Sequence, residues 1–527
     1  MKLIVSIIMS FLLITALFAG CSTQTGTAEQ SATDTTDTTV TTVVSSTSSD
    51  EMFSDRDKEI GYSESESSII TLADNASSAS GDGAEVENDT VTITKEGTYI
   101  LTGSLSNGQI VVDAADDAKI QLVLNGVDIT NESSAAIYVK NADKVFVTTA
   151  SGTENTLSVT GEFVQTDDNK IDGAIFAKSD LTLNGAGTLT ICSAYGHGVV
   201  SKDDLAVTSG TYVITAAEQG ISGKDSVRIA DGIFTIEAGT DGIHSENEDD
   251  TTLGFVYIAG GTITISANDD GIHAETSATI LGGEIDITKS YEGIEGLVIN
   301  ISGGETNIIS SDDGLNAAGG ADQSGNGGMG GGMGATEVCA ITISGGTLSI
   351  NASGDGIDSN GSLTISGGTI TVSGPTDSGN GTIDYNGIGE ITGGTLLGAG
   401  SSGMAEGFSD GSTQCSILYN FSSVQAAGTT VSLKDESGDV LAEFTPAKQF
   451  ASVNISAPTL TSGSTYTLVV GTEEYTIELS STSFSNGGQG GVGGQQPQGE
   501  NRPSGGKGGP GGTMPNDASS SATVTQS

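Results

Sequence analysis

The stretch IAGGTITISANDDGIH at residues 258–273 decides the fold, because both of its parts recur along the chain. The first part is a strand pattern, GGTITI at 260–265. Its clearest copies are GGEIDI at 282–287, GGTLSI at 345–350 and GGTITV at 367–372. With looser copies included, the last glycines of the series are Gly187, Gly210, Gly232, Gly261, Gly283, Gly304, Gly346, Gly368 and Gly394. Most steps between them are nearly equal, and two are longer.

A second signature lies between these strands and keeps the same period. In most copies it is an acidic residue, then glycine, then an aliphatic residue, as in Asp270-Gly271-Ile272. Its copies contain Gly173, Gly198, Gly220, Gly242, Gly271, Gly293, Gly314, Gly356 and Gly381. A period of about 22 residues, with short alternating β-branched segments, is too short for a propeller blade and suits one turn of a parallel β-helix. We therefore predict an all-β protein built on a right-handed parallel β-helix, with stacked aliphatic side chains as its core.

The two long steps mark insertions. The step from Gly232 to Gly261 contains an acidic extension within Ser245 to Gly254, and the step from Gly304 to Gly346 contains a Gly-rich loop within Ala317 to Thr336. Both interrupt the connection that follows the second signature. We therefore expect both loops on one side of the helix, where insertions usually border a functional surface.

The ends of the chain differ in composition from its centre. An apolar run after Lys2 ends in Ala19-Gly20-Cys21, which resembles a bacterial lipoprotein signal with Cys21 as the lipidated residue. An ordinary signal peptide with a chance cysteine is the alternative. The predicted segments are a signal peptide (1–20), a disordered Ser/Thr-rich tether (21–66), the parallel β-helix (67–412), a C-terminal β module or cap (413–482) and a disordered Gly/Gln/Pro-rich tail (483–527). We expect a monomer held by its lipid on the extracellular face of the cell membrane.

The charge balance excludes several classes of partner. The chain has 527 residues, with 17 Lys+Arg against 67 Asp+Glu, and its formal net charge is −50. Such a surface repels nucleic-acid phosphates and anionic lipid headgroups, so we exclude nucleic-acid binding and polybasic membrane association. Hard cations are the expected partners.

Acidic residues recur at equivalent turns of successive coils. Neighbouring strands lie about 4.7–4.9 Å apart, so carboxylates stacked at that spacing repel one another unless a cation intervenes. A calcium ion takes about six to eight oxygen ligands and can bridge carboxylates of adjacent coils. We predict calcium at several coils, with ligands from Asp241, Asp269, Asp270, Glu292, Asp312, Asp313 and Asp355. The alternative for each Asp-Gly pair is ordinary turn chemistry, in which Asp caps the turn and Gly supplies a positive φ.

A polar row follows the aliphatic position of the second signature. It consists of His244, His273, Glu295, Asn316, Asp358 and, with a shift of one position, Asp384. These side chains are candidates for hydrogen bonds to sugar hydroxyls or for completing metal sites, and a solvated face is the alternative. The chain has only 3 His and no His-Glu-x-x-His spacing, so the sequence gives no support for catalytic zinc.

Basic residues are scarce in the repeats. Lys178, Lys202 and Lys224 recur in matched segments, each followed closely by Asp. They form either salt-bridge ladders or a row that receives sugar carboxylates. We place Lys202, Lys224 and Tyr291 among the candidate carbohydrate-binding residues. Arg228, beside Lys202 or Lys224, is the only candidate base cluster for a lyase that acts on polyuronates.

Several segments resemble one bacterial family. They are Asn125 to Thr130, Ala135 to Val145, Gly198 to Asp204, Gly223 to Ala230, Lys289 to Gly293 and Ser401 to Ala405. The resemblance is to secreted "carbohydrate-binding domain-containing" proteins, and it spans about residues 67 to 480. It implies a calcium-containing parallel β-helix related in shape to polysaccharide lyases, without established catalysis. It also implies likeness to a clostridial cell-surface protein that binds cellulose and acidic, pectin-type sugars.

These observations predict non-catalytic binding of polysaccharide, either cellulose or acidic, pectin-type sugars, by a calcium-stabilised β-helix. A calcium-dependent polyuronate lyase and a structural or adhesive surface lipoprotein are the alternatives. The chain has no Trp, so any aromatic contact to a sugar comes from Tyr195, Tyr257, Tyr291 or Tyr385.

Overall fold

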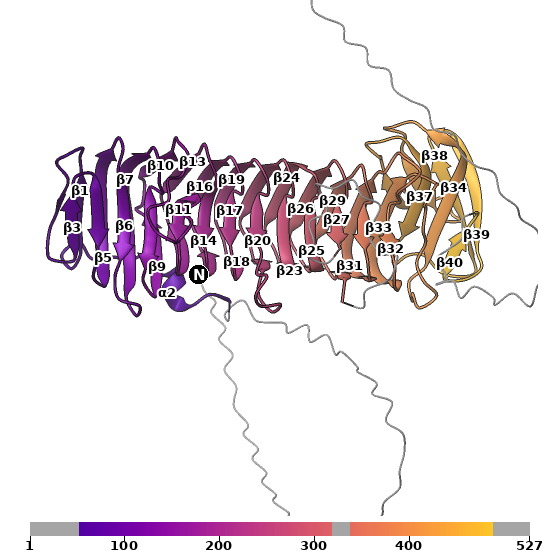
Figure 1. The fold of residues 1–527 in the computed structure, drawn as a ribbon. Helices are drawn as coiled ribbons and strands as arrows, with labels where there is room; N and C mark the ends of the chain where they lie inside the picture. Colours follow the sequence, from indigo (N-terminus) through magenta and orange to yellow (C-terminus); the bar gives the residue numbers. More distant parts are fainter. Residues whose placement is uncertain (1–51, 319–337, 488–527) are drawn as a thin grey trace, which may run out of the picture. The chain divides into compact units, whose positions relative to one another are not determined.

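The computed structural model describes residues 52–318 and 338–487. In these residues nearly all regular structure is β, and the strands wind in successive coils around a common core (Figure 1). Strands of neighbouring coils pair in parallel, so that Ile243 of one coil opposes Ile272 of the next. The predicted parallel β-helix is confirmed.

Each full coil contributes a strand to each of three faces. The first face contains β4 (Thr90–Ile93), β6 (Gln109–Asp113), β8 (Ile137–Asn141), β11 (Gly173–Ala177), β14 (His197–Ser201), β17 (Ile221–Gly223), β20 (Ile243–Ser245), the first parts of β23 (Ile272–Ile280) and β25 (Ile294–Ile301), β27 (Leu315–Ala317), β30 (Ile357–Ser359) and β32 (Asp384–Tyr385). The second face contains β1 (Ser68–Leu72), the first parts of β5 (Gly97–Leu105) and β7 (Lys119–Asn131), β9 (Lys144–Thr149), β12 (Asp180–Gly185), β15 (Asp204–Val207), β18 (Ser226–Ile229), β21 (Phe255–Ile258), the second parts of β23 and β25, β28 (Ala340–Ile343) and the first parts of β31 (Ser362–Ser373) and β33 (Gly389–Gly400). The third face contains the second parts of β5 and β7, β10 (Glu154–Val159), β13 (Thr188–Ser193), β16 (Thr211–Ala216), β19 (Ile233–Ala238), β22 (Thr262–Ala267), β24 (Glu284–Ser290), β26 (Glu305–Ser310), β29 (Thr347–Asn351) and the second parts of β31 and β33. Two short antiparallel strands, β2 (Ser78–Ala79) and β3 (Ala84–Glu87), flank β1 and β4.

Facing residues on the first face repeat with the period predicted from the sequence. The successive Cα partners are Ile221, Ile243, Ile272, Ile294, Leu315 and Ile357. The two long steps, from Ile243 to Ile272 and from Leu315 to Ile357, contain the insertions, which join β20 to β21 and β27 to β28. Both insertions therefore leave the helix at the corner between the first and second faces, as expected. Residues 319–337 of the second insertion lie outside the described residues.

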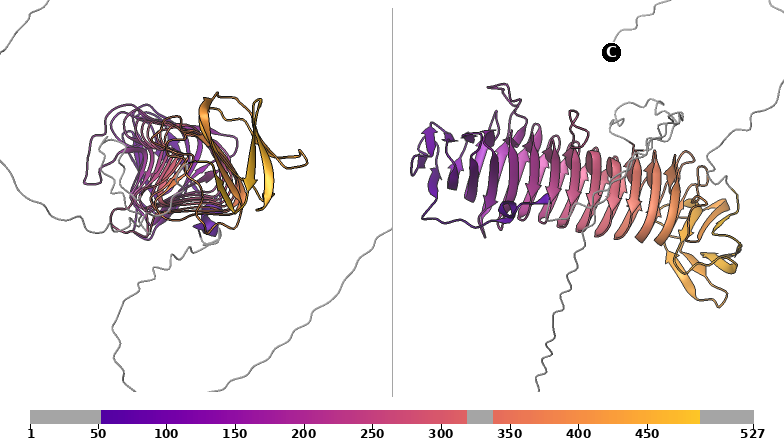
Figure 2. Two further views of the ribbon diagram at one scale, coloured as in Figure 1. Left: turned by 90° about the vertical axis from the view of Figure 1, so that its right-hand side faces the viewer. Right: turned by 90° about the horizontal axis from the view of Figure 1, so that it is seen from below.

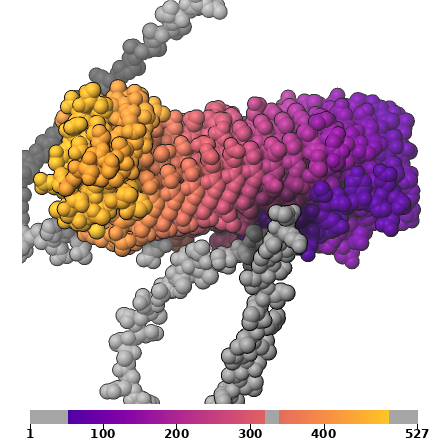
Figure 3. Space-filling model, turned by 180° about the vertical axis from the view of Figure 1, so that it is seen from behind, coloured from indigo at the N-terminus to yellow at the C-terminus, as the bar shows by residue number. Residues whose placement is uncertain are grey.

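The core consists of aliphatic stacks that run along the helix. On the third face Ile236, Ile265, Ile287, Ile308 and Ile350 are successive Cα partners, and each is at most 2% exposed. Full burial of each such side chain contributes about 1.5–3 kcal/mol. Alternation puts the residues between them on the outer surface, where side chains of successive coils lie in rows (Figure 3).

Glycine is required at two places in most repeats for different reasons. The second Gly of the strand signature has a positive φ, as at Gly346 with φ 82°. The Gly of the second signature is needed because the coils approach closely. At Gly271 a Cβ would lie 2.6 Å from the carbonyl oxygen of Gly293 and 2.7 Å from Ile287. Gly271 is not among the described positive-φ glycines, so positive φ is the wrong explanation for the Gly of this Asp-Gly pair.

A short segment from the predicted tether packs against the second face, and the prediction of disorder is wrong for residues 52–59. Ser54 caps the helix α2 (Asp55–Lys58), and Phe53 is buried against Tyr257. Asp57 is buried, lies 2.9 Å from Lys144 Nζ and accepts a hydrogen bond of 2.6 Å from Thr182. These groups lie on β9, β12 and β21, far along the chain, so composition alone could not predict the contact.

A C-terminal module closes the last coil. β37 (Phe450–Ser456) pairs antiparallel with β33 and β34 (Ser416–Gln425), and β40 (Ser483–Ser485) pairs with β34. A separate four-stranded sheet contains β36 (Val440–Phe444), β35 (Val431–Lys434), β38 (Ser464–Val470) and β39 (Glu473–Leu479). Viewed along the helix axis the coils superimpose, with this module beside them (Figure 2). Because β40 begins at Ser483, ordered structure extends slightly beyond the predicted start of the tail.

The predicted signal peptide with Cys21, the tether up to residue 51 and the tail from residue 488 lie outside the described residues. Within the described ranges, no helix has the length and apolar character needed to cross a membrane.

Candidate functional site

The predicted polar row is a ladder of facing residues on the first face. In order along the helix its members are Ser222, His244, His273, Glu295, Asn316, Asp358 and Asp384. The rings of His244 and His273 stack with centroids 4.9 Å apart and planes inclined by 10°. The alignment predicted from the sequence is confirmed, including the shift of one position at Asp384.

The acidic residues of the second signature lie in the turn just before this ladder. Some of their carboxylates accept a hydrogen bond from the backbone of the equivalent turn on the next coil. Asp241 accepts one of 3.1 Å from the Asp270 N–H. Asp313 accepts one of 2.6 Å from the Asp355 N–H. The turn chemistry that we considered as an alternative is therefore present, although it acts between coils. In both bonds the acceptor is the Oδ1 atom, so Oδ2 of each carboxylate remains for other contacts.

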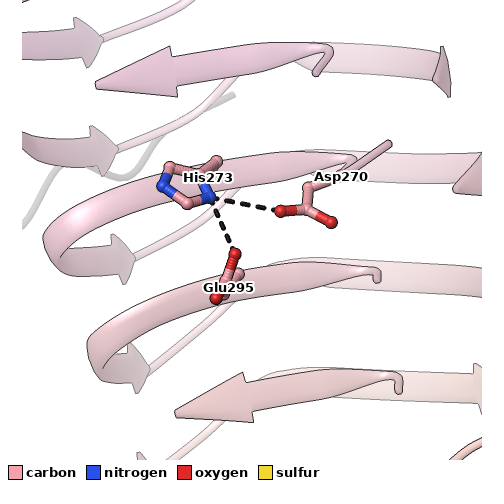
Figure 4. A group of neighbouring side chains, drawn as sticks. All are labelled: Asp270, His273 and Glu295. Carbon is pink, nitrogen blue, oxygen red and sulfur yellow. Dashed lines mark hydrogen bonds and ion pairs between the residues drawn. The ribbon is translucent and has the colours of Figure 1, made fainter. Parts of the chain in front are cut away.

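Three buried groups converge between two coils at the middle of the ladder. Nδ1 of His273 lies 3.1 Å from Oδ2 of Asp270 and 2.8 Å from Oε2 of Glu295 (Figure 4). The side chains of His273, Asp270 and Glu295 are only 7%, 5% and 6% exposed, respectively. Burial and the neighbouring Glu295 raise the pKa of Asp270, while the two carboxylates raise the pKa of His273 against the opposing effect of burial. Ligand atoms of all three residues lie within 4.8 Å of one another, close enough to hold a metal ion.

A second group consists of carboxylates alone. Oxygens of Asp313, Asp355 and Asp358 also lie within 4.8 Å of one another. Burial and repulsion by neighbouring carboxylates raise the pKa of Asp355 to about 8 and that of Asp358 to about 7, and they raise the pKa of Asp313 well above its usual range. Asp312 and Asp384 are among these neighbours. No basic side chain is among the main causes of these shifts, so within this group either protons or a bound cation must offset the charge of the carboxylates.

Calcium fits this second group on two observations. The donor set contains only oxygen, which is the ligand that calcium prefers. The side chain of Asn316, which opposes Asp358 on the ladder, is buried, and its Oδ1 has no hydrogen-bond partner among the described residues. Its Nδ2 donates to Oε2 of Glu292 at 2.7 Å, so the amide orientation is fixed by that bond. Asp313, Asp355, Asp358 and Asn316 would supply the protein oxygens.

A hollow of about 310 Å³ lies beside the two histidines. Its lining includes Asp241, His244, Asp269, Asp270 and His273. The carboxylate of Asp241 lies 2.8 Å from Nδ1 of His244. The hollow is thus lined by imidazoles and carboxylates, and it reaches the buried group of Asp270 and His273.

The remaining predicted metal ligands are distributed differently. Glu292 accepts the hydrogen bond from Asn316, and burial together with the charges of Glu295 and Asp270 raises its pKa to about 10. Asp312 is half-buried and accepts a hydrogen bond from Tyr291. The structure therefore brings Asp270, Asp313 and Asp355 into compact groups and places Asp241, Asp269, Glu292 and Asp312 around them.

The predicted basic residues are engaged in ion pairs. Lys202 lies 3.2 Å from Asp172, and Lys224 lies 2.7 Å from Asp249. Arg228 is mostly buried, lies 2.7 Å from Asp204 and donates a hydrogen bond of 3.0 Å to the carbonyl of Met52. Residue 52 begins the segment that crosses the second face, so Arg228 is covered.

The four candidate tyrosines differ in accessibility. Tyr257 and Tyr385 are buried, Tyr291 is half-buried, and Tyr195 is 44% exposed. Tyr195 lines a hollow of about 380 Å³ together with Phe163. Tyr195 is therefore the candidate best placed to stack on a sugar.

Two acidic residues near the ladder were not among the site residues predicted from the sequence. Glu246, from the first insertion, lies 3.4 Å from Nε2 of His244. Glu406 lies near Asp384, and burial followed by that charge raises its pKa to about 7. The acidic character of the insertion was a usable signal for Glu246. Glu406 follows the end of the repeats, where no period marks its position.

Comparison with known proteins finds a family match for part of the β-helix. Residues 87–334 match the sequence model of a family described as "Carbohydrate-binding domain-containing protein". A curated protein of that name from Acetivibrio thermocellus is 37% identical over 150 residues, which are 28% of this chain and 52% of the relative. The chain thus spans about half the length of this curated relative.

A solved structure gives a further match. It is described as the polysaccharide lyase-like protein from C. thermocellum in a gadolinium derivative, and it is 36% identical to this chain. The match covers 45% of this chain and 97% of that chain, with a TM-score of 0.42. On this match, residues 87–334, which form most of the β-helix, belong to the family of carbohydrate-binding domain-containing proteins.

Proposed function

We propose that the protein binds polysaccharide without cleaving it, and that calcium on the first face takes part in the binding. The observation that carries the proposal is the group formed by Asp313, Asp355 and Asp358. Asp313 lies within residues 87–334, which match the carbohydrate-binding family, and the two other carboxylates come from the coil that follows. Three carboxylates whose ligand oxygens lie within 4.8 Å of one another are ionised together only when a cation balances them.

The charge of the chain means that an acidic sugar can bind only together with a cation. A polyuronate carries one carboxylate on each sugar unit and is repelled by a protein of net charge −50. A calcium ion between protein and sugar removes this repulsion. It takes about six to eight oxygen ligands, so a few protein carboxylates leave coordination positions free for the carboxylates and hydroxyls of the sugar. Acidic, pectin-type polysaccharide bound through calcium is the form that we favour, and cellulose is the neutral alternative.

The surroundings of Arg228 support binding rather than cleavage. A lyase needs an accessible base that reaches the proton next to the sugar carboxylate. Arg228 is paired with Asp204 and covered by Met52, and the two predicted lysines are paired with Asp172 and Asp249. The lyase that we considered has no accessible base at this position.

We further propose that the protein is displayed outside the cell through a lipid on Cys21. The support is the sequence Ala19-Gly20-Cys21 after an apolar run. The Ser/Thr-rich segment that follows would hold the binding face away from the membrane.

Retention on insoluble polysaccharide tests the proposal. The purified protein is mixed with insoluble polygalacturonate or cellulose, in calcium or in a chelator, and both pelleted protein and absorbance of unsaturated sugar are followed. We expect calcium-dependent retention on polygalacturonate without new absorbance. New absorbance would show a lyase, and no retention on either polymer in calcium would remove the carbohydrate proposal.

A matched pair of variants locates the binding face. Asp355→Asn combined with Asp358→Asn removes two carboxylates of the proposed calcium group and should abolish retention on polygalacturonate. Asp286→Asn removes a half-exposed carboxylate on the third face and should leave retention unchanged. Equal retention of both variants would place the sugar elsewhere.

A further inference from the structure

The group of Asp270, His273 and Glu295 differs chemically from the all-carboxylate group farther along the ladder. Its central atom is an imidazole nitrogen, Nδ1 of His273, which faces one carboxylate from its own coil and one from the next. Figure 4 shows both carboxylates directed at that nitrogen, while the other ring nitrogen points away from them. Divalent transition metals accept imidazole nitrogen together with carboxylate oxygen, whereas calcium is bound almost entirely by oxygen.

The charge of this group calls for a divalent ion. Two carboxylates face a single imidazole nitrogen in a buried position, so a proton on that nitrogen can offset only one of their two negative charges. When a divalent metal replaces the Nδ1 proton, which passes to solvent, the metal, the neutral imidazole and the two carboxylates sum to zero. The carboxylate of Asp241, which accepts a hydrogen bond from the Asp270 N–H, adds further negative charge that a second positive charge would offset.

The spacing of the group matches a zinc ion. Zn–N and Zn–O bonds of about 2.0–2.2 Å in a tetrahedron separate neighbouring ligand atoms by about 3.4 Å. The observed separations from Nδ1 are 3.1 Å and 2.8 Å, so the ligands move apart by only a few tenths of an ångström. Because His273 and Glu295 are facing residues on paired strands, the backbone fixes their relative positions.

The group also has a route to solvent. Asp270 and His273 line the hollow of about 310 Å³ that His244 and Asp241 share. An ion can enter through this hollow, and a water molecule in it can complete a tetrahedral shell around three protein ligands. The all-carboxylate group does not line this hollow.

We propose that Asp270, His273 and Glu295 form a site for a divalent transition metal of the zinc class, separate from the all-carboxylate calcium group. This proposal goes beyond the proposed function, since neither polysaccharide nor calcium is needed for it. The ladder then carries two kinds of metal site a few coils apart, because one position of the repeat changes from histidine to acidic residues along the helix.

Zinc titration of the whole protein in excess calcium tests the proposal. Calcium occupies the oxygen-only groups, and ZnCl₂ binding is followed by calorimetry. We expect one zinc ion to bind per chain with release of a proton. Co²⁺ in the same site should give visible bands typical of a low-coordinate site with a nitrogen ligand. Displacement of zinc by millimolar calcium would overturn the assignment to the zinc class.

Variants identify the ligands. His273→Gln should weaken zinc binding by about 100-fold or more, and Asp270→Asn or Glu295→Gln by at least about 10-fold. His197→Gln is the matched control, because His197 lies on the same face, 3.1 Å from Glu218, outside the group. Equal losses in His197→Gln and His273→Gln would overturn the proposal.

The variants must be folded for this comparison, so each is first melted in calcium. His273→Gln is expected to keep a cooperative transition, since its ring contributes to no aliphatic stack of the core. If His273→Gln shows no cooperative transition, zinc binding is compared in Glu295→Gln instead. The amide of glutamine keeps the size of the glutamate side chain and removes only its charge. A protein that binds zinc through these ligands but retains no polysaccharide would overturn the proposed function and leave the zinc site intact.

Discussion

His244 and His273 are facing residues on consecutive coils and their rings stack 4.9 Å apart, yet they lie among different carboxylates. His244 contacts Asp241 and the half-exposed Glu246, whereas His273 lies between two buried carboxylates. One repeat position thus produces two environments. The difference arises from the residue on the next coil, which is His273 for His244 and Glu295 for His273.

Removal of calcium should destabilise the protein. A ligand present at about 100 times its Kd adds about 2.7 kcal/mol per site, and a chelator removes this contribution. We expect a clear fall in Tm by calorimetry when calcium is chelated. The Asp355→Asn, Asp358→Asn double variant should melt at the same temperature with and without calcium. Without calcium it should be more stable than the parent, because repulsion in the group is relieved. An unchanged Tm of the parent on chelation would remove calcium from the proposal.

The packing of residues 52–59 should depend on pH through Asp57. Burial alone would raise the pKa of Asp57, but the hydrogen bond from Thr182 and the charge of Lys144 outweigh it and lower the pKa to about 2. An acid with a lowered folded-state pKa stabilises the fold above its unfolded pKa, and this stabilisation is lost as the pH falls from about 4 to about 2. Asp57→Asn should cost about 2 kcal/mol at neutral pH and little at pH ~2.

Urea unfolding at several pH values measures this effect. Asp82→Asn is the control, because Asp82 is highly exposed and its pair with Lys95 contributes little. Equal losses in Asp57→Asn and Asp82→Asn at neutral pH would show that the buried pair has no special role.

Asp203 should give the opposite pH dependence. Burial, followed by the charges of Asp180 and Asp225, raises the pKa of Asp203 to about 6. A raised acid pKa favours the protonated folded state, so this contribution to stability is present below pH ~4 and is lost as the pH rises to about 6. Asp203→Asn should therefore stabilise the protein at pH 7 and change little at pH 4. A destabilised variant at pH 7 would show that Asp180 and Asp225 do not repel Asp203 in the folded protein.

Close packing of the coils predicts a severe effect of one methyl group. A Cβ on Gly293 would overlap the carbonyl oxygen of Gly314 and the side chain of Ile308. Neither neighbour can move without separating the coils, so Gly293→Ala should cost about 1–3 kcal/mol or more in urea unfolding. Gly61→Ala is the control, because a Cβ there meets nothing within 4 Å. Equal stability of the two variants would show that the coils can separate without cost.

Much of the fold could be predicted from the sequence because the same structural unit, one coil, recurs many times along the chain. A coil cannot bury its aliphatic face alone, so Ile265 and its equivalents must stack on neighbouring coils, and the period of the repeat then fixes which residues face each other. The ladder from His244 to Asp384 followed from that period alone. The packing of Asp57 against Thr182 did not, because a single contact between residues so far apart in sequence leaves no period.

The sequence by itself determined the parallel β-helix, the register of its ladder and the side from which the insertions leave. Local spacing sets these features, since every coil repeats the same hydrogen bonds. Only the tertiary structure decided which of the aligned acidic side chains form compact groups. The spacing of the coils brings many carboxylates near one another, and the direction and burial of each side chain determine which of them meet. That selection put His273 between Asp270 and Glu295, and the N-terminal segment that begins with Met52 covers Arg228.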